Sequence, residues 1–328
     1  MKFSIIIPVK KISDYVREAI PHFQKQTYRD FEIIIISEYK EKEKFPHTKI
    51  LKSKEAPPAE KRNLGAKLAK GEILAFIDDD AYPKEDWLEK AYKNFRDKDI
   101  IAIGGPSIVP KGATLFQEIS SKVYELSSKK TGVRYTQKRK QYIDDWPTCN
   151  LFVRKKEFNM VRGFDSGSWG AEDTRLCYSL LRNNKKMIYD PNVVVYHHPR
   201  KNLSDHLRQT FFWGLWRGFI MKLYRQSLQP VFFIPSIFVL WLIIGGALSL
   251  FFLTIRKIYL FSLLLYLLYL FVLGIKVQKL KLFFPVIILT YLTHLAYGIG
   301  FLKGMLSIKE PTKKTFNPAE NTFTNKIL

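Results

Sequence analysis

The sequence is poor in cysteine and in acidic residues. Its two cysteines, Cys149 and Cys177, match no metal-binding spacing, so we expect free thiols in a reducing compartment. Asp and Glu number 30 against 53 Lys and Arg, which gives a formal net charge of +23. Such a charge suits nucleic acid, anionic lipid headgroups or phosphorylated substrates. Because no motif that reads RNA or DNA accompanies the charge, nucleic acid is not an expected partner.

Acidic residues are missing from three long apolar stretches near the C-terminus, at residues 231–253, 258–275 and 282–302. Each is long enough to cross about 30 Å of hydrocarbon, which takes about 20 residues. A soluble helix rarely stays apolar on all faces over such a length, so the pattern predicts three transmembrane helices. Residues 211–230 are expected to form an amphipathic helix at the membrane surface, and residues 307–328 a polar basic tail.

The charges of the loops leave the membrane orientation open. If the N-terminal part is cytoplasmic, the loop at Arg256 and Lys257 lies outside, and three crossings place the basic tail outside as well. That outcome opposes the preference of basic segments for the cytoplasm. Either the tail is tolerated outside, or one segment is re-entrant and the number of crossings is even. The apolar run at residues 3–9 is too short for a signal peptide.

Up to about residue 210, short apolar runs alternate with helical patterns. Strands are expected at residues 2–9, 31–36, 50–51, 73–77, 100–103, 150–154 and 193–196. Ser13 can cap a helix over residues 13–20, and a second helix is expected at 59–68. This alternation predicts a right-handed, doubly wound and mostly parallel α/β sheet.

An aspartate triplet, Asp78-Asp79-Asp80, ends the strand expected at residues 73–77. Three carboxylates at one strand end repel one another, so they need a cation or strong hydrogen-bond donors. Open α/β sheets also bind ligands at the carboxyl ends of their strands. Because side chains alternate along a strand, Asp78 and Asp80 can face one cation while Asp79 points elsewhere. A solvated acidic turn is the alternative interpretation.

Five motifs, in order, resemble those of family 2 glycosyltransferases of the GT-A fold over roughly residues 1–217. They are the run Phe3-Ser-Ile-Ile-Ile-Pro-Val9, Lys61-Arg62-Asn63-Leu64-Gly65, the aspartate triplet, Gly163-Phe164-Asp165 and Trp169-Gly170-Ala171-Glu172-Asp173. The resemblance implies a GT-A catalytic domain over residues 1–210, followed by an all-α transmembrane region. It also implies a nucleoside-diphosphate sugar donor, linked to UDP or GDP.

The resemblance further implies a role for each matching residue. The donor would be bound by Pro8, Val9, Glu38, Arg62, Asp78 and Asp79. Mg²⁺ or Mn²⁺ would be held by Asp78, Asp80 and His197. Such a cation can bridge two phosphates and neutralise the leaving group. The acceptor would be contacted by Trp146, Asn150, Trp169 and Glu172, although Trp169 suits a core position equally well.

Asp173 is the expected general base, because inverting transfer needs a carboxylate that takes the proton of the acceptor hydroxyl. It stands at the start of a helix expected over residues 173–182, where the helix dipole stabilises its charge. A role limited to capping that helix is the alternative.

Three positions depart from the family's pattern. Ser37-Glu38 stands where the family usually has Asp-Asp or Asp-Gly-Ser, although Glu38 can still accept a hydrogen bond from a base. Arg175 replaces the second aspartate of the Glu-Asp-x-Asp motif. Phe212 occupies the arginine position of the Gln-x-x-Arg-Trp motif found in processive synthases, which argues against processive synthesis.

These features predict a metal-dependent inverting glycosyltransferase, anchored as a multi-pass protein in the cell membrane with a cytoplasmic catalytic domain. It would transfer one sugar to a lipid-linked or membrane-proximal saccharide. Residues 294–304 resemble the closing span of bacterial exopolysaccharide transferases. One alternative is a polyprenyl-phosphate sugar synthase, whose anionic acceptor needs no base. The other is a non-catalytic membrane protein with a degenerate domain, suggested by Ser37-Glu38 and Arg175.

Overall fold

The computed structural model describes residues 1–127, 132–137, 139–166, 169–183, 185–224 and 227–311, so most of the predicted basic tail lies outside the described residues. The chain divides into two compact units. One consists of Met1–Ala113 and Ser128–His198, and the other of Thr114–Ser127 and Pro199–Leu328. Cys149 and Cys177 both lie in the first unit and are free and buried.

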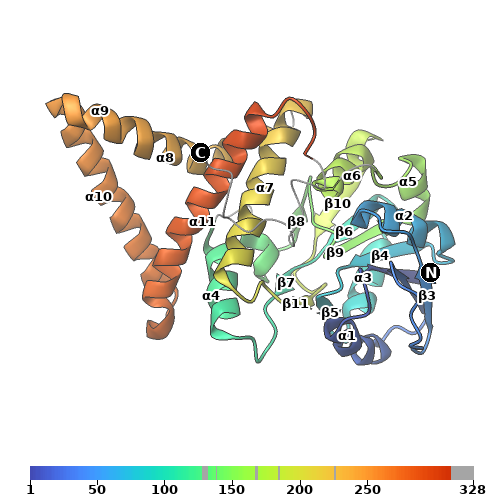
Figure 1. The fold of residues 1–328 in the computed structure, drawn as a ribbon. Coiled ribbons are helices and arrows are strands. Elements are labelled where there is room, and N and C mark those ends of the chain that lie inside the picture. The colour runs from blue at the N-terminus through green and yellow to red at the C-terminus, as the bar shows by residue number, and fades with distance from the viewer. Residues whose placement is uncertain (128–131, 138, 167–168, 184, 225–226, 312–328) are drawn as a thin grey trace. The chain divides into compact units, whose positions relative to one another are not determined.

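An eight-stranded sheet forms the centre of the first unit (Figure 1). Its order is β3-β2-β1-β4-β9-β6-β10-β8. The strands are β1 (Phe3–Pro8), β2 (Phe31–Ser37), β3 (Thr48–Lys52), β4 (Ile73–Ile77), β6 (Ile100–Gly104), β8 (Gln141–Tyr142), β9 (Asn150–Arg154) and β10 (Lys186–Tyr189). The sheet is mixed, because β9 runs antiparallel to both β4 and β6, while β3, β2, β1 and β4 are parallel to one another.

A second, three-stranded sheet follows the aspartate triplet. Its order is β5-β11-β7, formed by β5 (Ala81–Pro83), β11 (Val195–His197) and β7 (Ser107–Ile108). The strand expected at residues 193–196 is therefore β11, which lies outside the large sheet. Antiparallel pairing sets His197 opposite Ala81, and this register brings the imidazole to the end of the triplet.

Helices of the first unit connect the strands. They are α1 (Asp14–Gln24), α2 (Pro58–Leu68), α3 (Trp87–Phe95), α5 (Lys155–Met160) and α6 (Glu172–Leu180), with short 3-10 turns η1 (Gly132–Tyr135) and η2 (Leu181–Asn183). Ser13 caps α1 by accepting a hydrogen bond from the Val16 amide, as its position predicts. The helix continues past Pro21 to Gln24, one turn beyond its expected end. A proline this close to the end removes one hydrogen bond, and its own carbonyl still accepts from the Lys25 amide.

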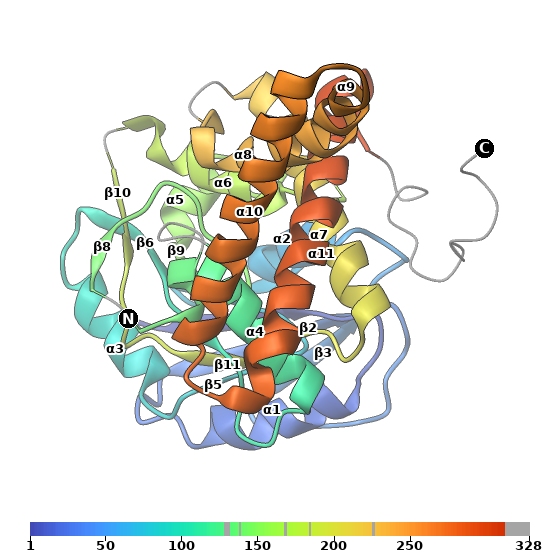
Figure 2. The same cartoon turned by 90° about the vertical axis from the view of Figure 1, so that its left-hand side faces the viewer.

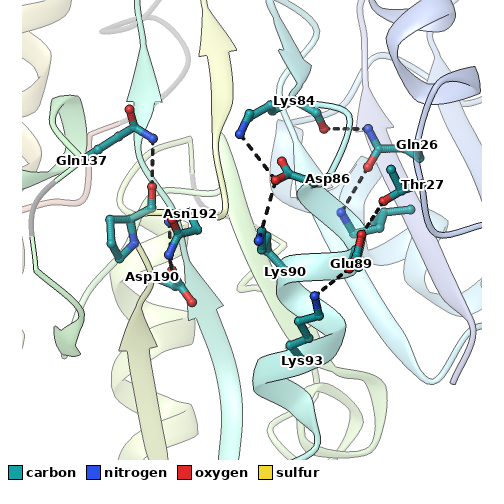
Figure 3. Close-up of polar contacts among 12 residues, drawn as sticks. Gln26, Thr27, Lys84, Asp86, Glu89, Lys90, Lys93, Gln137, Asp190 and Asn192 are labelled. Carbon is teal, nitrogen blue, oxygen red and sulfur yellow. Dashed lines mark hydrogen bonds and ion pairs between the residues drawn. The ribbon is translucent and has the colours of Figure 1, made fainter.

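Polar contacts between α1 and α3 fix the segment that follows the triplet (Figure 3). Gln26 donates to the carbonyl of Lys84 over 2.7 Å and accepts from the Leu88 amide over 3.1 Å. Thr27 donates to the carboxylate of Glu89 over 2.8 Å. These bonds tie the start of α3 to the end of α1, so the turn after the triplet is held from both sides.

The second unit is helical. It contains α4 (Leu115–Ser127), α7 (Leu203–Leu223), η4 (Pro230–Phe232), α8 (Ile234–Leu240), the π-helical turn η5 (Trp241–Gly245), α9 (Gly246–Phe251), α10 (Leu253–Lys276) and α11 (Leu280–Leu306). Within the described residues, three helical stretches are long and apolar enough to cross a membrane, namely Pro230–Phe251, Leu253–Lys276 and Leu280–Leu306. The domain boundary expected after residue 210 falls inside the single helix α7.

Glycines bring α7 and α11 into backbone contact. A Cβ on Gly214 would lie 2.3 Å from the carbonyl oxygen of Tyr297, and one on Gly218 would lie 2.3 Å from that of Phe301. Because both partners advance along their helices together, α7 and α11 run in the same direction. Small residues allow this close approach between apolar helices.

Replacing Gly300 by leucine should separate these helices, because a Cβ there would lie 2.1 Å from the carbonyl oxygen of Phe211. We expect a loss of about 1–3 kcal/mol in unfolding free energy, which is typical of overpacking. Thermal unfolding in detergent measures it. The matched control is Ile299→Leu on the exposed face, which should leave the melting temperature unchanged. Equal melting temperatures for both variants would contradict the close α7–α11 contact.

Candidate active site

The residues expected to bind the donor lie at the carboxyl ends of three neighbouring strands. Pro8 is the last residue of β1 and Val9 follows it, Glu38 follows β2, and the aspartate triplet follows β4. Since β2, β1 and β4 are adjacent and parallel, these ends meet at one edge of the sheet. The side chain of Val9 is buried, and its backbone carbonyl faces α2, where it accepts a hydrogen bond.

Lys61 on α2 connects two of these strand ends. Its ammonium group lies 2.6 Å from a carboxylate oxygen of Glu38 and donates to the carbonyl of Val9 over 2.8 Å. Both side chains of the ion pair are largely buried, so it holds Glu38 in place at the end of β2. Sequence reasoning did not select Lys61, although it lies beside Arg62 in the same motif.

Arg62 connects the aspartate triplet to the start of α6. Its two terminal nitrogens lie 2.8 Å from Asp78 Oδ1 and 2.9 Å from Glu172 Oε1, and its side chain is only 5% exposed. Burial opposes the charge, but the two carboxylates outweigh this effect and raise the pKa of Arg62. In the described part of the chain its Nε has no hydrogen-bond partner. The guanidinium therefore joins two predicted site residues that are far apart in the sequence.

Asn63 fixes the Gly-Phe-Asp segment beside this ion-pair group. Its side-chain amide donates to the carbonyl of Phe164 over 2.8 Å and accepts from the Phe164 amide over 2.9 Å. Gly163 has a left-handed backbone (φ 73°), and a Cβ there would lie 2.5 Å from Asn63 Oδ1. Arg175, which departs from the family's pattern, forms an ion pair with Asp165 and so supports the same segment.

Asp173 lies in the first turn of α6 among other carboxylates. Burial, then the charges of Glu172 and Asp145, raise its pKa to about 7, against the opposing effect of Arg134. Its Oδ1 accepts a hydrogen bond from the Thr174 amide over 2.8 Å. A carboxylate with a pKa near neutrality can accept a proton during a reaction at that pH.

Two residues that sequence reasoning did not select surround Asp173. Asp145 accepts a hydrogen bond from Thr174 Oγ1 over 3.0 Å, and one nitrogen of Arg134 lies 3.6 Å from its other oxygen. Residue 171, an alanine, precedes α6 with a left-handed backbone (φ 54°), a strained conformation for a residue other than glycine. No sequence pattern indicated these contacts, because they join separate segments.

The expected metal ligands are only partly brought together. Asp80 Oδ1 lies 3.3 Å from His197 Nε2, whereas Asp78 is paired with Arg62. Among the described residues, no group of three or more His, Cys, Asp or Glu side chains could hold a metal ion. A hard divalent cation uses as few as one or two protein carboxylates when phosphates supply further ligands. Asp80 and His197, both partly exposed, fit such an ion.

Asn150, expected to contact the acceptor, is fully buried instead. Its carbonyl oxygen accepts from the indole of Trp87 over 2.9 Å, and its amide donates to the carbonyls of Pro106 (3.0 Å) and Val193 (2.7 Å). A Cβ on Gly105 would lie 1.7 Å from that Val193 oxygen, so this packing requires glycine. Asn150 thus has no exposed surface with which to contact an acceptor.

The other three expected acceptor residues differ in exposure. Trp146 is buried and donates to the carbonyl of Gly105 over 3.1 Å, so it belongs to the core as well. Glu172 and Trp169 are partly exposed, and Glu172 is paired with Arg62. Only these two have surface that an acceptor could reach.

Comparison with known proteins agrees with this architecture. Residues 4–158 match the sequence profile of Glycosyl transferase family 2. This part of the chain belongs to that family. The chain is 26% identical over 162 residues to a pre-mycofactocin glycosyltransferase of Mycobacterium tuberculosis (strain CDC 1551 / Oshkosh). The match covers 48% of this chain and 33% of that protein.

Two further proteins match over nearly the whole chain. A dolichyl N-acetyl-alpha-D-glucosaminyl phosphate 3-beta-D-2,3-diacetamido-2,3-dideoxy-beta-D-glucuronosyltransferase of Methanococcus voltae is 23% identical over 323 residues, covering 92% of this chain and 97% of its own. The solved structure of mannosyltransferase PcManGT from Pyrobaculum calidifontis, in complex with GDP-Man and Mn²⁺, is 15% identical with a TM-score of 0.61. The match covers 92% of this chain and 87% of the PcManGT chain, and this likeness shows the fold.

Replacing Asn150 by alanine should destabilise the protein, because it leaves the Trp87 indole and two backbone carbonyls unpaired in the core. Each buried group without a hydrogen bond costs about 1–3 kcal/mol, so we expect the free energy of unfolding to fall by about 3 kcal/mol or more. Thermal unfolding measures it, with the exposed Asn159→Ala as the matched control. Native stability combined with weaker acceptor binding would instead support the acceptor role.

Proposed function

We propose that this protein transfers one sugar, with inversion, from a nucleoside-diphosphate donor to a lipid-linked or membrane-proximal saccharide. The observation that carries the proposal is the pair of bonds from Arg62 to Asp78 and Glu172, next to Asp173. They link the strand end where α/β sheets bind ligands to a carboxylate with a pKa near neutrality. Transfer to a hydroxyl needs both parts in one site.

On the donor side, Pro8, Val9 and Glu38 would frame the nucleotide, with Asp78 and Asp79 near its phosphates. Asp80 and His197, together with Asp78, would hold Mg²⁺ or Mn²⁺, which when bound neutralises charge on the diphosphate leaving group. UDP and GDP donors are both compatible with these residues.

On the acceptor side, Asp173 would take the proton of the attacking hydroxyl, and Glu172 and Trp169 would contact the saccharide. The raised pKa of Asp173 favours a hydroxyl acceptor over a bare lipid phosphate, because a phosphate needs no proton removed. The name of the Methanococcus voltae relative, which matches over nearly its whole length, supports a lipid-linked saccharide. Phe212, in the position of the processive arginine, supports transfer of a single sugar.

The apolar helices of the second unit support a location in the cell membrane. The catalytic domain would lie in the cytoplasm, where nucleotide sugars are made available. A donor in the aqueous phase and an acceptor fixed in the bilayer would then meet at the membrane surface. The strong positive charge of the chain suits anionic lipid headgroups on that side.

Replacing Asp173 by asparagine should lower the rate of sugar transfer by about 10²–10⁴-fold, the usual contribution of a general base. Binding of UDP or GDP, measured by calorimetry with and without Mn²⁺, should stay within about twofold of the unmodified protein, because the nucleotide does not contact this carboxylate. The matched control is Asp99→Asn, an exposed aspartate in the same unit.

Substantial transfer by the Asp173 variant would contradict the assignment of the base. Efficient transfer to bare polyprenyl phosphate, unaffected by the substitution, would favour the synthase alternative. Failure of the unmodified protein to bind either nucleotide would favour a degenerate, non-catalytic domain.

The pH dependence of the transfer rate should follow the ionisation of Asp173. A general base acts when deprotonated, so kcat should rise with pH and level off above about 7. Replacing Glu172 by glutamine removes a charge that raises this pKa, so the rise should move to lower pH. Rates at saturating substrate between about pH 5 and about pH 9 measure it, with Glu89→Gln on α3 as the control. An unmoved profile in the Glu172 variant would assign the titration to another group.

A further inference from the structure

We propose that α11 lies in the plane of the membrane surface and that only Pro230–Phe251 and Leu253–Lys276 cross the bilayer. The acyl layer of the lipid would contact one face of α11, and protein helices would cover its other face. The described chain then crosses twice, so residues 307–311 are on the same side of the membrane as the residues before η4. This inference does not depend on the reaction.

The exposed apolar side chains of α10 form a broad face that includes Ile258, Leu260, Phe261, Leu264, Leu265, Leu267, Leu268 and Val272. The other face, which includes the buried Leu270, Leu273 and Gly274, packs on neighbouring helices. A helix with such a broad exposed apolar face suits a membrane crossing. Its length of 24 residues, about 36 Å, also suffices.

The exposed apolar stripe of α11 is narrower, because a larger share of this helix is buried than of α10. Phe284 is 68% exposed, Ile288 59%, Tyr291 36% and Ile299 50%, and these positions recur at helical spacing on one face. The opposite face is buried and includes Leu282, Val286, Leu289, Thr293 and Phe301. One exposed apolar face and one covered face are typical of a helix at an interface.

The first half of α11 is covered by α4, which carries charges. Ile119 and Val123 of α4 pack against the buried face of α11. Glu118 of α4 lies 3.5 Å from Lys279, just before α11 begins. Two further charged residues of α4, Lys122 and Glu125, are partly exposed and pair with each other.

The second half of α11 is covered by α7, which is also charged. The glycine contacts hold the two helices together in parallel, and Lys222 at the end of α7 donates to the carbonyl of Ser307. Asp205, Arg208 and Arg217 lie on the same helix. Both views show α11 beside α4 and α7 (Figures 1 and 2). The first half of α10 diverges from α11 in Figure 1, and its last turns pack on the first turns of α11, where Gly274 lies against Phe283 and Ile287.

A polar junction joins the three helices near the middle of α11. His206 of α7 lies 2.8 Å from Ser120 of α4 and 2.9 Å from Thr293 of α11 through its two ring nitrogens. Tyr124 of α4 stacks on the same imidazole. This junction makes α4, α7 and α11 one packed layer, so α11 cannot change its tilt without the other two.

A crossing orientation of α11 would therefore carry α4 and α7 into the hydrocarbon. The Asp, Glu, Arg and Lys side chains of α4 and α7 would then lose their contact with water, and placing such charged groups in the bilayer core is unfavourable. If the layer lies flat, those charges stay on the aqueous side and the apolar stripe meets the acyl chains. Lys281 and Lys303, exposed at the two ends of α11, can then reach anionic headgroups.

Cysteine labelling in the full chain tests the number of crossings. Lys309→Cys, Lys201→Cys and Lys257→Cys, made singly, are exposed to a membrane-impermeant maleimide in sealed vesicles of each orientation. We expect Lys309→Cys and Lys201→Cys to react from the same side, and Lys257→Cys from the opposite side. The unmodified protein is the control, because its two cysteines are buried. Reaction of Lys309→Cys and Lys201→Cys from opposite sides would overturn the proposal.

The depth of nitroxide labels provides a second, independent test. Labels at Phe284, Tyr291 and Ile299 should show equal depth in anionic vesicles, measured by accessibility to oxygen and to a water-soluble nickel complex. A crossing helix would place the middle label about 10 Å deeper than the first. Residues 258, 265 and 272 of α10, at closely similar spacing, are the control and should show that deeper middle. The same depth profile in α11 as in α10 would overturn the proposal.

Discussion

The buried guanidinium of Arg62 is the constraint on which the rest of the site depends. A cation this deep in the protein is tolerated only when carboxylates surround it, and removal of one partner costs about 3–5 kcal/mol in comparable pairs. The end of β4 and the start of α6 must therefore both reach α2. Lys61 and Asn63, its neighbours in sequence, extend the same arrangement to Glu38 and to the Gly-Phe-Asp segment.

The same ion pairs shape the electrostatics around Asp173. Glu172 is neutralised by Arg62 on one side, but its charge still raises the pKa of the adjacent carboxylate, together with that of Asp145. Arg134, which forms an ion pair with Asp145, opposes the increase. The cations of the site thus hold the framework, and Asp173 stays surrounded by negative charge. This is the arrangement that keeps a carboxylate able to accept a proton near neutral pH.

Local patterns in the sequence predicted the parts of this site that depend on local structure. The apolar run of β4 and the triplet after it were clear because both follow from strand periodicity and charge. Lys61 and Asp145 were missed because their roles depend on contacts with distant segments. Asn150 was expected to contact the acceptor because the family resemblance suggested that role, whereas here its side chain satisfies buried backbone groups.

Hydropathy likewise could not separate α10 from α11, because both are apolar over a crossing length. What distinguishes them is α4, whose residues 115–127 lie far away in the sequence and pack on α11. The chain passes between the two units after residues 113, 127 and 198. The helical unit therefore includes a segment, residues 114–127, that lies within the sequence of the first unit. A fragment ending at residue 210 would leave Ile119 and Val123 without their apolar partners, and His206 without Thr293. The apolar helical unit is therefore part of the fold that carries the site, because its helix α4 interrupts the first unit.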